Sequence, residues 1–264
     1  MKIICLNAGH GGRDPGAVSP WGHREAPAAL AITLACREHL TERYTGHRLV
    51  LPRDDDTWVG LTTRKQIAER EGGDLYVSMH LNFARNAAGQ PIGHGFESFI
   101  YTSPRAETVR YQQAIHTAVY SYLQTLSIAD RGMKRSQHWE PTNIMMPVVL
   151  LEYWFLSNQR EAALTTNPEI LKRAGEATAR GIAQALQLPQ KQTPAPVEPW
   201  PPVISPLPQI QRTIGVKVDG QKTNEIGFLI NNQTYTRASF NAELAGHEVT
   251  GHGDHIDWKT KGRR

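Results

Sequence analysis

Strand-like and helix-like segments alternate along the chain from Met1 to about Leu188. Apolar strand patterns occupy 2–7, 48–52, 74–80, 95–101 and 147–153, and helical patterns occupy 25–43, 61–71, 107–126 and 168–188. Successive parallel strands need a crossover between them, and a helix is its usual form. The pattern therefore predicts an α/β domain of three layers, in which helices flank a largely parallel mixed sheet.

A proline-rich stretch separates this domain from a smaller one. About half of the 17 prolines lie between Pro189 and Pro208, which is typical of an extended, semi-rigid linker. Beyond it the sequence predicts a strand at 214–218, a hairpin turn at Asp219-Gly220, a second hairpin at 227–235 and a short helix at 239–245. We therefore predict a large domain at 1–188, a linker at 189–209 and a small β-rich (α+β) module at 210–264. A module this small has a marginal core, so its expected role is binding.

Composition narrows the classes of partner. The chain has a net charge of +4 and is 39% hydrophobic and 20% charged, which is ordinary for a soluble protein. No apolar run approaches the ~20 residues of a membrane-spanning helix, so no transmembrane segment is predicted. The basic residues favour anionic partners, but they are scattered, which argues against a nucleic-acid-binding element. Cys5 and Cys36 lie in apolar segments without a CxxC spacing, and we predict buried free thiols.

Three segments that lie far apart in the sequence each contain a residue able to bind a metal. His10 follows the first strand in a glycine-rich turn, Glu25 begins a helix, and His80 ends a predicted central strand, where α/β sheets place their sites. Two histidines and a carboxylate are a ligand set of catalytic zinc, which keeps one position open for water. Each residue also has an ordinary structural interpretation, and His23 is a rival to Glu25 as the third ligand.

Glu152 lies inside the apolar run 148–155. A carboxylate in such a run is costly to bury unless it is paired or functional. In a zinc hydrolase, a carboxylate outside the ligand set can move the proton of the attacking water. Glu152 is therefore the candidate acid–base residue, and a buried ion pair is the alternative interpretation.

Over residues 1 to about 188 the chain resembles the zinc-dependent N-acetylmuramoyl-L-alanine amidases of the amidase-3 type. The motifs that carry the resemblance are Asn7-Ala8-Gly9-His10-Gly11-Gly12-Arg13-Asp14-Pro15-Gly16-Ala17, Glu25, Arg53-Asp54-Asp55-Asp56-Thr57 with Leu61 and Arg64, Ser78-Met79-His80-Leu81-Asn82, Asp130-Arg131-Gly132, and 147–158. The resemblance implies zinc held by His10, Glu25 and His80, with Glu152 as the general acid–base. It also implies hydrolysis of the amide between the lactyl group of N-acetylmuramic acid and L-alanine in peptidoglycan.

The chain departs from the family pattern at two places. The family often has Asp where this chain has Asn7, a position that we expect to orient the first histidine or its turn. The glycine that usually follows the catalytic glutamate is replaced by Tyr153-Trp154. We expect these rings to reshape access to the cleft or to form a wall on which a sugar stacks.

Four further residues are candidates for substrate binding: Asn82, Arg131, His138 and Trp154. The planar fork of Arg131 suits a peptide carboxylate, and a structural ion pair is the alternative. His138 lies beside Trp139 in a predicted loop, where the indole is a candidate for stacking on a saccharide. In the small module, a further group suggests either a second metal cluster or a flexible loop: His247, His252, Asp254, His255 and Asp257.

The expected biological role combines these observations. The first residues form a strand and do not match a signal peptide, so we expect synthesis in the cytoplasm without an export signal. With a tethered module, the chain resembles a bacteriophage or prophage endolysin, which stays in the host cytoplasm until lysis and then acts on the cell wall. Peptidoglycan is the expected substrate, and anionic wall polymers are candidate ligands of the module. The alternatives are a bacterial autolysin, spore or division amidase, a zinc amidohydrolase or peptidase on another substrate, and a non-catalytic wall-binding protein.

Overall fold

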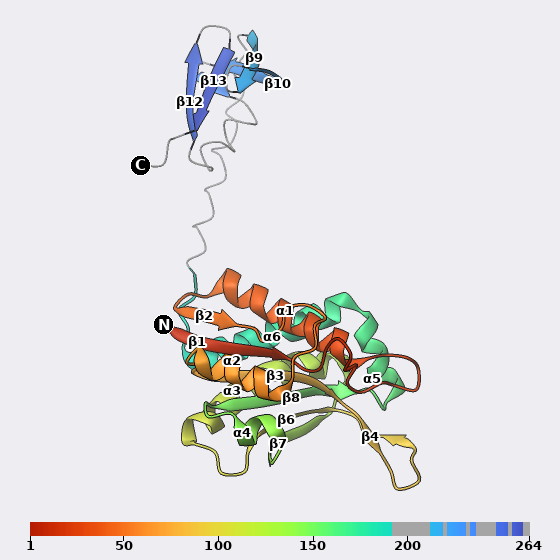
Figure 1. Cartoon of the computed structure of the whole chain (residues 1–264). Helices are drawn as coiled ribbons and strands as arrows, with labels where there is room; N and C mark the ends of the chain where they lie inside the picture. Colours follow the sequence, from red (N-terminus) through yellow and green to blue (C-terminus); the bar gives the residue numbers. More distant parts are fainter. Residues whose placement is uncertain (192–211, 219–220, 231–232, 236–246, 253–254, 261–264) are drawn as a thin grey trace. The chain divides into compact units, whose positions relative to one another are not determined.

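The computed structural model divides the chain into two compact units, Met1–Gln192 and Thr193–Arg264 (Figure 1). The described residues are 1–191, together with the strands at 212–218, 221–230, 233–235, 247–252 and 255–260. From position 192 onward the predicted linker lies outside the described residues. In the described part of the chain, every helix is too short or too polar to cross a membrane.

A six-stranded sheet forms the centre of the first unit, with strand order β2-β1-β3-β8-β6-β7. Its strands are β1 (Lys2–Ala8), β2 (His47–Val50), β3 (Leu75–Asn82), β6 (Phe96–Tyr101), β7 (Asp130–Ser136) and β8 (Val148–Phe155). All neighbouring pairs are parallel except β6 and β8. The predicted mixed, largely parallel sheet is therefore confirmed. The edge strand β7 was not predicted, because Met133 is the one apolar side chain in its seven residues.

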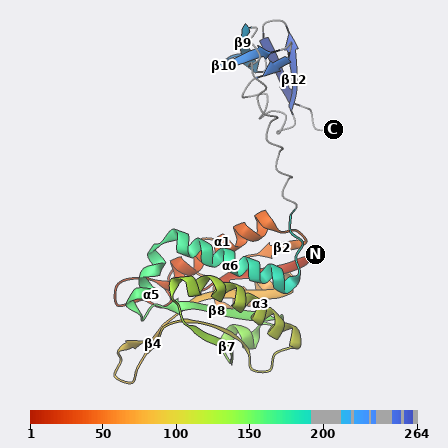
Figure 2. The ribbon, with the colours of Figure 1, turned by 180° about the vertical axis from the view of Figure 1, so that it is seen from behind.

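Helices cover both faces of this sheet. The long helices α1 (Glu25–Arg43), α3 (Ala106–Leu123) and α6 (Pro168–Leu186) lie over one face, in front of the sheet in Figure 2. The shorter helices α2 (Leu61–Arg70) and α4 (Trp139–Asn143) lie over the other, and α5 (Gln159–Ala163) follows β8. Two 3-10 turns, η1 (Gln124–Leu126) and η2 (Leu164–Thr166), and a small hairpin of β4 (Ala84–Arg85) and β5 (Pro91–Ile92) complete the unit. The predicted α/β fold with flanking helices is confirmed.

Helix α6 packs closely between α1 and α3. A Cβ atom at Gly175 would lie 2.4 Å from the carbonyl oxygen of Ile32, and one at Gly181 would lie 2.6 Å from Cα of Ile115. Asn167 caps the start of this helix, because its side chain accepts hydrogen bonds from the backbone N–H groups of Glu169 and Ile170, and Pro168 is the first helical residue. Small residues therefore allow the three long helices to form one layer over the larger core.

Strand alternation separates this core from the polar face of the sheet. In β3, Leu75, Val77 and Met79 are fully buried against α1, α3 and α6. The intervening residues point to the opposite face, where Tyr76 belongs to a small core under α2 and α4. Ser78 and His80 continue on that face toward the carboxyl end of the strand. The polar residues of the central strands therefore gather at one end of the face that carries the short helices.

The second unit contains a five-stranded sheet with order β11-β10-β9-β13-β12. Its strands are β9 (Arg212–Val218), β10 (Gln221–Ile230), β11 (Gln233–Tyr235), β12 (His247–His252) and β13 (His255–Thr260). β10 pairs antiparallel with both β9 and β11, at the two positions where the sequence predicts hairpins. The predicted helix at 239–245 and the side chains of the suggested second metal cluster lie outside what the structure describes.

Candidate active site

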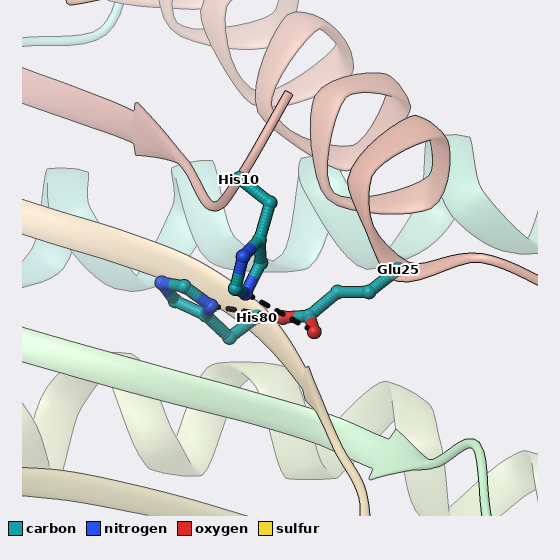
Figure 3. Close-up of side chains that lie close together, drawn as sticks. All are labelled: His10, Glu25 and His80. Atoms are coloured by element: carbon teal, nitrogen blue, oxygen red, sulfur yellow. Dashed lines mark hydrogen bonds and ion pairs between the residues drawn. The ribbon is translucent and has the colours of Figure 1, made fainter. Parts of the chain in front are cut away.

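Three side chains from different parts of the first unit converge at the carboxyl end of β1 and β3 (Figure 3). Glu25 Oε2 lies 3.2 Å from His10 Nε2, and Glu25 Oε1 lies 2.8 Å from His80 Nδ1. One ligand atom from each residue fits within a group whose members are all within 4.8 Å of one another. Ligand atoms around a tetrahedral zinc are about 3.3 Å apart, given bonds of about 2.0–2.1 Å. The spacing and the donor types therefore fit a metal ion.

Glycines make this convergence sterically feasible. A Cβ atom at Gly9 would lie 2.3 Å from the His80 ring, so the imidazole occupies the space that a side chain would need. Gly16 has a φ of +66°, and a Cβ there would contact both His10 and Glu25 at less than 3 Å. Glu25 is fixed further by the backbone N–H groups of Ala17 and Leu81, which donate to its two oxygens. The carboxylate thus has a defined orientation between the two imidazoles.

Two buried arginines hold the turn that carries His10. The guanidinium of Arg53 donates to the carbonyl oxygens of Ala8 and Gly9, at 3.0 and 2.6 Å. Arg64 donates to the carbonyl oxygens of Ala8 and His10, at 2.6 and 2.5 Å. His10 has a left-handed backbone with a φ of +58°, which is unfavourable for a residue with a side chain. The arginines therefore stabilise a strained turn that the site requires.

Each imidazole also faces a second carboxylate through its other nitrogen. His10 Nδ1 lies 2.8 Å from Asp14 Oδ2, and His80 Nε2 lies 3.7 Å from Glu140 Oε2. Such carboxylates commonly orient metal-binding histidines. Asp14 belongs to the glycine-rich motif, but the sequence indicated no role for it. Glu140 was missed, because it lies 60 positions from His80 in a polar segment without a recognisable pattern.

Electrostatics at the three convergent residues favour a cation. Burial alone would raise the pKa of Glu25, but hydrogen bonds and charge from His10 and His80 lower it well below its usual value. Burial alone would lower the pKa of His80, but Glu140 and Glu25 raise it well above the usual histidine value. A field that holds a proton on this imidazole also favours a metal cation. The chemistry of the donor set therefore agrees with its geometry.

Glu152 lies beside the convergent residues but bonds to none of them. In β8 it is the register partner of His80 on β3 and of Glu97 on β6, so all three point to the same face. Its Oε2 atom is buried and has no hydrogen-bond partner among the described residues. Burial raises its pKa to about 8, and the nearby Glu25, Glu97 and Glu140 carboxylates act in the same direction, against the opposing charge of His80. A cation bound nearby would lower that pKa again.

A match to a protein-family model shows which family the chain belongs to. Residues 4–184 match the model described as N-acetylmuramoyl-L-alanine amidase. The chain belongs to that family. The geometry above is thus the candidate active site of an amidase, an enzyme that hydrolyses an amide bond in peptidoglycan.

Several known proteins are similar to this chain. It is 36% identical over 192 residues to an endolysin of Bacillus phage SPP1, covering 72% of this chain and 68% of that protein. It is 35% identical over 188 residues to a sporulation-specific N-acetylmuramoyl-L-alanine amidase of Bacillus subtilis, covering 71% and 69%. Among solved structures, the catalytic domain of CwlV from Bacillus (Paenibacillus) polymyxa var. colistinus superposes with a TM-score of 0.64 at 28% identity, covering 71% and 99%.

The structure corrects one expectation about the amidase and resolves a choice between ligands. Trp154 is fully buried in the larger core, as is Tyr153, whose hydroxyl bonds to Thr178 Oγ1. The predicted sugar-stacking wall is therefore wrong, because neither ring reaches the surface. Within the described residues, the metal-type cluster contains Glu25 and not His23. Cys5 and Cys36 are buried free thiols, as predicted.

Two of the three remaining substrate-binding candidates, Arg131 and Asn82, bond to a buried carboxylate, Glu97. Arg131 Nε donates to Glu97 Oε2 at 2.9 Å, Lys134 pairs with the same oxygen, and Asn82 Nδ2 donates to Oε1 at 2.6 Å. Arg131 therefore forms the structural ion pair that was the alternative to substrate binding. About a third of its side chain is nevertheless exposed. His138 is exposed and packs edge-on against Phe99, directly before α4 rather than inside a loop with Trp139.

Replacing Arg64 with Met should destabilise the amidase by at least about 2 kcal/mol, because the His10 carbonyl and the buried Asn7 Oδ1 lose the donor that Arg64 supplies. The control is Arg160→Met. Arg160 also donates to two backbone carbonyls but lies at an exposed position, so water can replace it and the loss should stay below about 0.5 kcal/mol. Urea unfolding of metal-free protein, followed by circular dichroism, measures both. Equal losses for the two variants would contradict the assigned role of Arg64.

Proposed function

We propose that His10, Glu25 and His80 hold a zinc ion and that the enzyme hydrolyses the amide between the lactyl group of N-acetylmuramic acid and L-alanine. The observation that carries the proposal is the convergence of these three side chains beside an unpartnered glutamate. Nitrogen and carboxylate donors in this number suit zinc and leave a position for water. The family to which the chain belongs supports the choice of bond.

Glu152 is the residue that moves protons in this proposal. When bound, zinc would acidify a water molecule and polarise the scissile carbonyl. Glu152 accepts a proton from the attacking water and transfers it to the alanine nitrogen, which leaves poorly unless it is protonated. The products are a lactyl carboxylic acid and a peptide with a free amino terminus. The carboxyl suits this task because its Oε2 has no competing partner among the described side chains.

Arg131 is the proposed anchor for the stem peptide of the substrate. Its Nε atom donates to Glu97, and the guanidinium lies 4.8 Å from the centre of the Phe155 ring. About a third of the side chain is exposed, so part of the guanidinium is free to bind a ligand. A planar, fixed guanidinium suits a carboxylate of the peptide. Asn82 shares the Glu97 carboxylate and helps to orient it, and His138 is the proposed contact to the glycan from the exposed rim.

We infer that the chain acts as an endolysin of a bacteriophage or prophage, and that it stays in the host cytoplasm until lysis. Its similarity to the phage SPP1 endolysin supports this inference. The sporulation-specific amidase of Bacillus subtilis is nearly as similar, so a bacterial autolysin is the second candidate. In either role, the second unit is proposed to bind the wall, with anionic wall polymers as its ligands, and so to raise the local concentration of the enzyme.

Replacing Glu152 with Gln should lower the rate of wall hydrolysis by about 10²- to 10⁴-fold while zinc stays bound, because only the proton acceptor is lost. Digestion of purified walls is measured through the release of free N-terminal alanine, and zinc through elemental analysis. His80→Ala is the matched control and should lose both zinc and activity. Near wild-type hydrolysis by Glu152→Gln would refute the assignment, and new reducing ends in place of free alanine would indicate a glycosidase.

Removing the second unit should weaken binding to the wall without changing the chemistry of cleavage. Full-length chain and residues 1–188, each carrying Glu152→Gln, are mixed with purified walls and sedimented. The shorter chain should remain in the supernatant to a larger extent. Equal sedimentation would show that the second unit does not bind the wall.

The endolysin and autolysin roles predict different preferred walls. An endolysin should digest walls of vegetative cells, and cells that contain the protein should lyse soon after their membrane is permeabilised. Turbidity of such cultures, with Glu152→Gln as the control, measures this. A strong preference for spore cortex over vegetative walls would instead favour the autolysin role.

A further inference from the structure

Glu140 is a buried carboxylate whose two oxygens face different partners. It lies in the first turn of α4 and is 4% exposed. Its Oε1 accepts a hydrogen bond from Asn7 Nδ2 at 2.8 Å and is 3.4 Å from the hydroxyl of Tyr76. Its Oε2 is left to face His80 Nε2 at 3.7 Å. The carboxylate is thus held from one side and directed at the imidazole from the other.

The second nitrogen of His80 needs an acceptor of this kind. Its Nδ1 faces Glu25 and the convergent ligand atoms, at 2.8 Å from Glu25 Oε1. A ring that uses Nδ1 for a metal carries its proton on Nε2, and that atom is buried without a hydrogen-bond partner in the described part of the chain. Buried N–H groups are nearly always paired. Within 4 Å of Nε2, Glu140 supplies the one described carboxylate.

The side-chain amide of Asn7 complements the carboxylate of Glu140, because it supplies a hydrogen-bond donor. Its amide group donates to Ser78 Oγ at 2.9 Å and to Glu140, while its Oδ1 accepts from Arg64 at 2.5 Å. An aspartate at this position would place a second carboxylate against Glu140 with no proton between them, which is unfavourable in a buried site. The departure of Asn7 from the aspartate that is frequent in the family therefore has a physical reason, which is the presence of Glu140.

We propose that Glu140 is a positioning residue, which accepts a hydrogen bond from the Nε2–H group of His80 and so fixes the tautomer and orientation of this ligand. The inference rests on the metal-binding role proposed above. It assigns to His80 the same arrangement that Asp14 provides for His10 at 2.8 Å. The two carboxylates differ in burial, since the Asp14 side chain is 46% exposed and that of Glu140 is 5% exposed. Water can replace Asp14 in part, whereas Glu140 is buried and is the one described carboxylate within 4 Å of His80 Nε2.

The zinc affinity of the folded, full-length chain tests this role. Glu140→Ala should weaken zinc binding by about 10- to 100-fold, and Glu140→Gln by less, because its amide oxygen can still accept a hydrogen bond from the Nε2–H group. Competition against a chromophoric chelator measures the affinity, and the visible spectrum of the cobalt-substituted chain reports ligand geometry. The matched control is Glu161→Gln. Glu161 is an equally buried carboxylate that accepts from the backbone of Gly95 and Phe155, and its loss should leave zinc affinity within twofold.

Exchanging the amide of Asn7 and the carboxylate of Glu140 distinguishes a role in positioning His80 from a role in the stability of the fold. Asn7→Asp should weaken zinc binding, and the double variant Asn7→Asp with Glu140→Gln should recover part of it, because amide and carboxylate face each other again. This pair remains informative even where Glu140→Ala does not fold. Zinc affinity within twofold of wild type in Glu140→Ala, or no recovery in the double variant, would overturn the inference. A wild-type chain that binds no zinc would instead refute the proposed function as well.

Discussion

The site depends on two buried guanidinium groups that hold the end of β1. Arg53 and Arg64 are 3% and 2% exposed, and the side-chain acceptor of Arg64 is the amide oxygen of Asn7 rather than a carboxylate. Backbone carbonyls of the turn at 8–10 also serve as their acceptors. Burial lowers the pKa of Arg53 to about 10, which still leaves it charged at neutral pH. The two charges thus stabilise a strained turn, and that turn places His10 opposite Glu25 and His80.

Sheet geometry supplies the remaining groups. Because side chains alternate between faces, one set of strand residues builds the large core and the other builds the polar face. His80, Glu152 and Glu97 are register partners across three neighbouring strands, so they form a row on that face. The short helix α4 adds Glu140, whose Oε2 lies 3.7 Å from His80 Nε2. Three neighbouring strands therefore bring His80, Glu152 and Glu97 together, and Glu25 from α1 meets His80 at the same end of the sheet.

The four carboxylates of the site differ in their hydrogen-bond and ion-pair partners. Glu25 lies between the imidazoles, Glu97 holds Arg131 and Lys134, and Glu140 is held by Asn7. Glu152 differs because its Oε2 has no partner in the described residues, and burial together with the neighbouring carboxylates raises its pKa. Acids that are bonded stay ionised, whereas the unbonded one is able to exchange a proton. The partners of each carboxylate therefore set its protonation behaviour, although the four side chains are chemically alike.

The sequence by itself determined the α/β alternation, the three metal-type residues and the acid inside an apolar strand, because periodicity and motif order are local properties. Tertiary structure decided what depends on long-range contacts. It showed that Trp154 is fully buried, because the residue packs into the larger core. It also brought Glu140 to His80, although no local pattern marks either the short helix or its acid. The partner of a buried polar group depends on which distant segments pack together. Local sequence patterns do not show these long-range contacts.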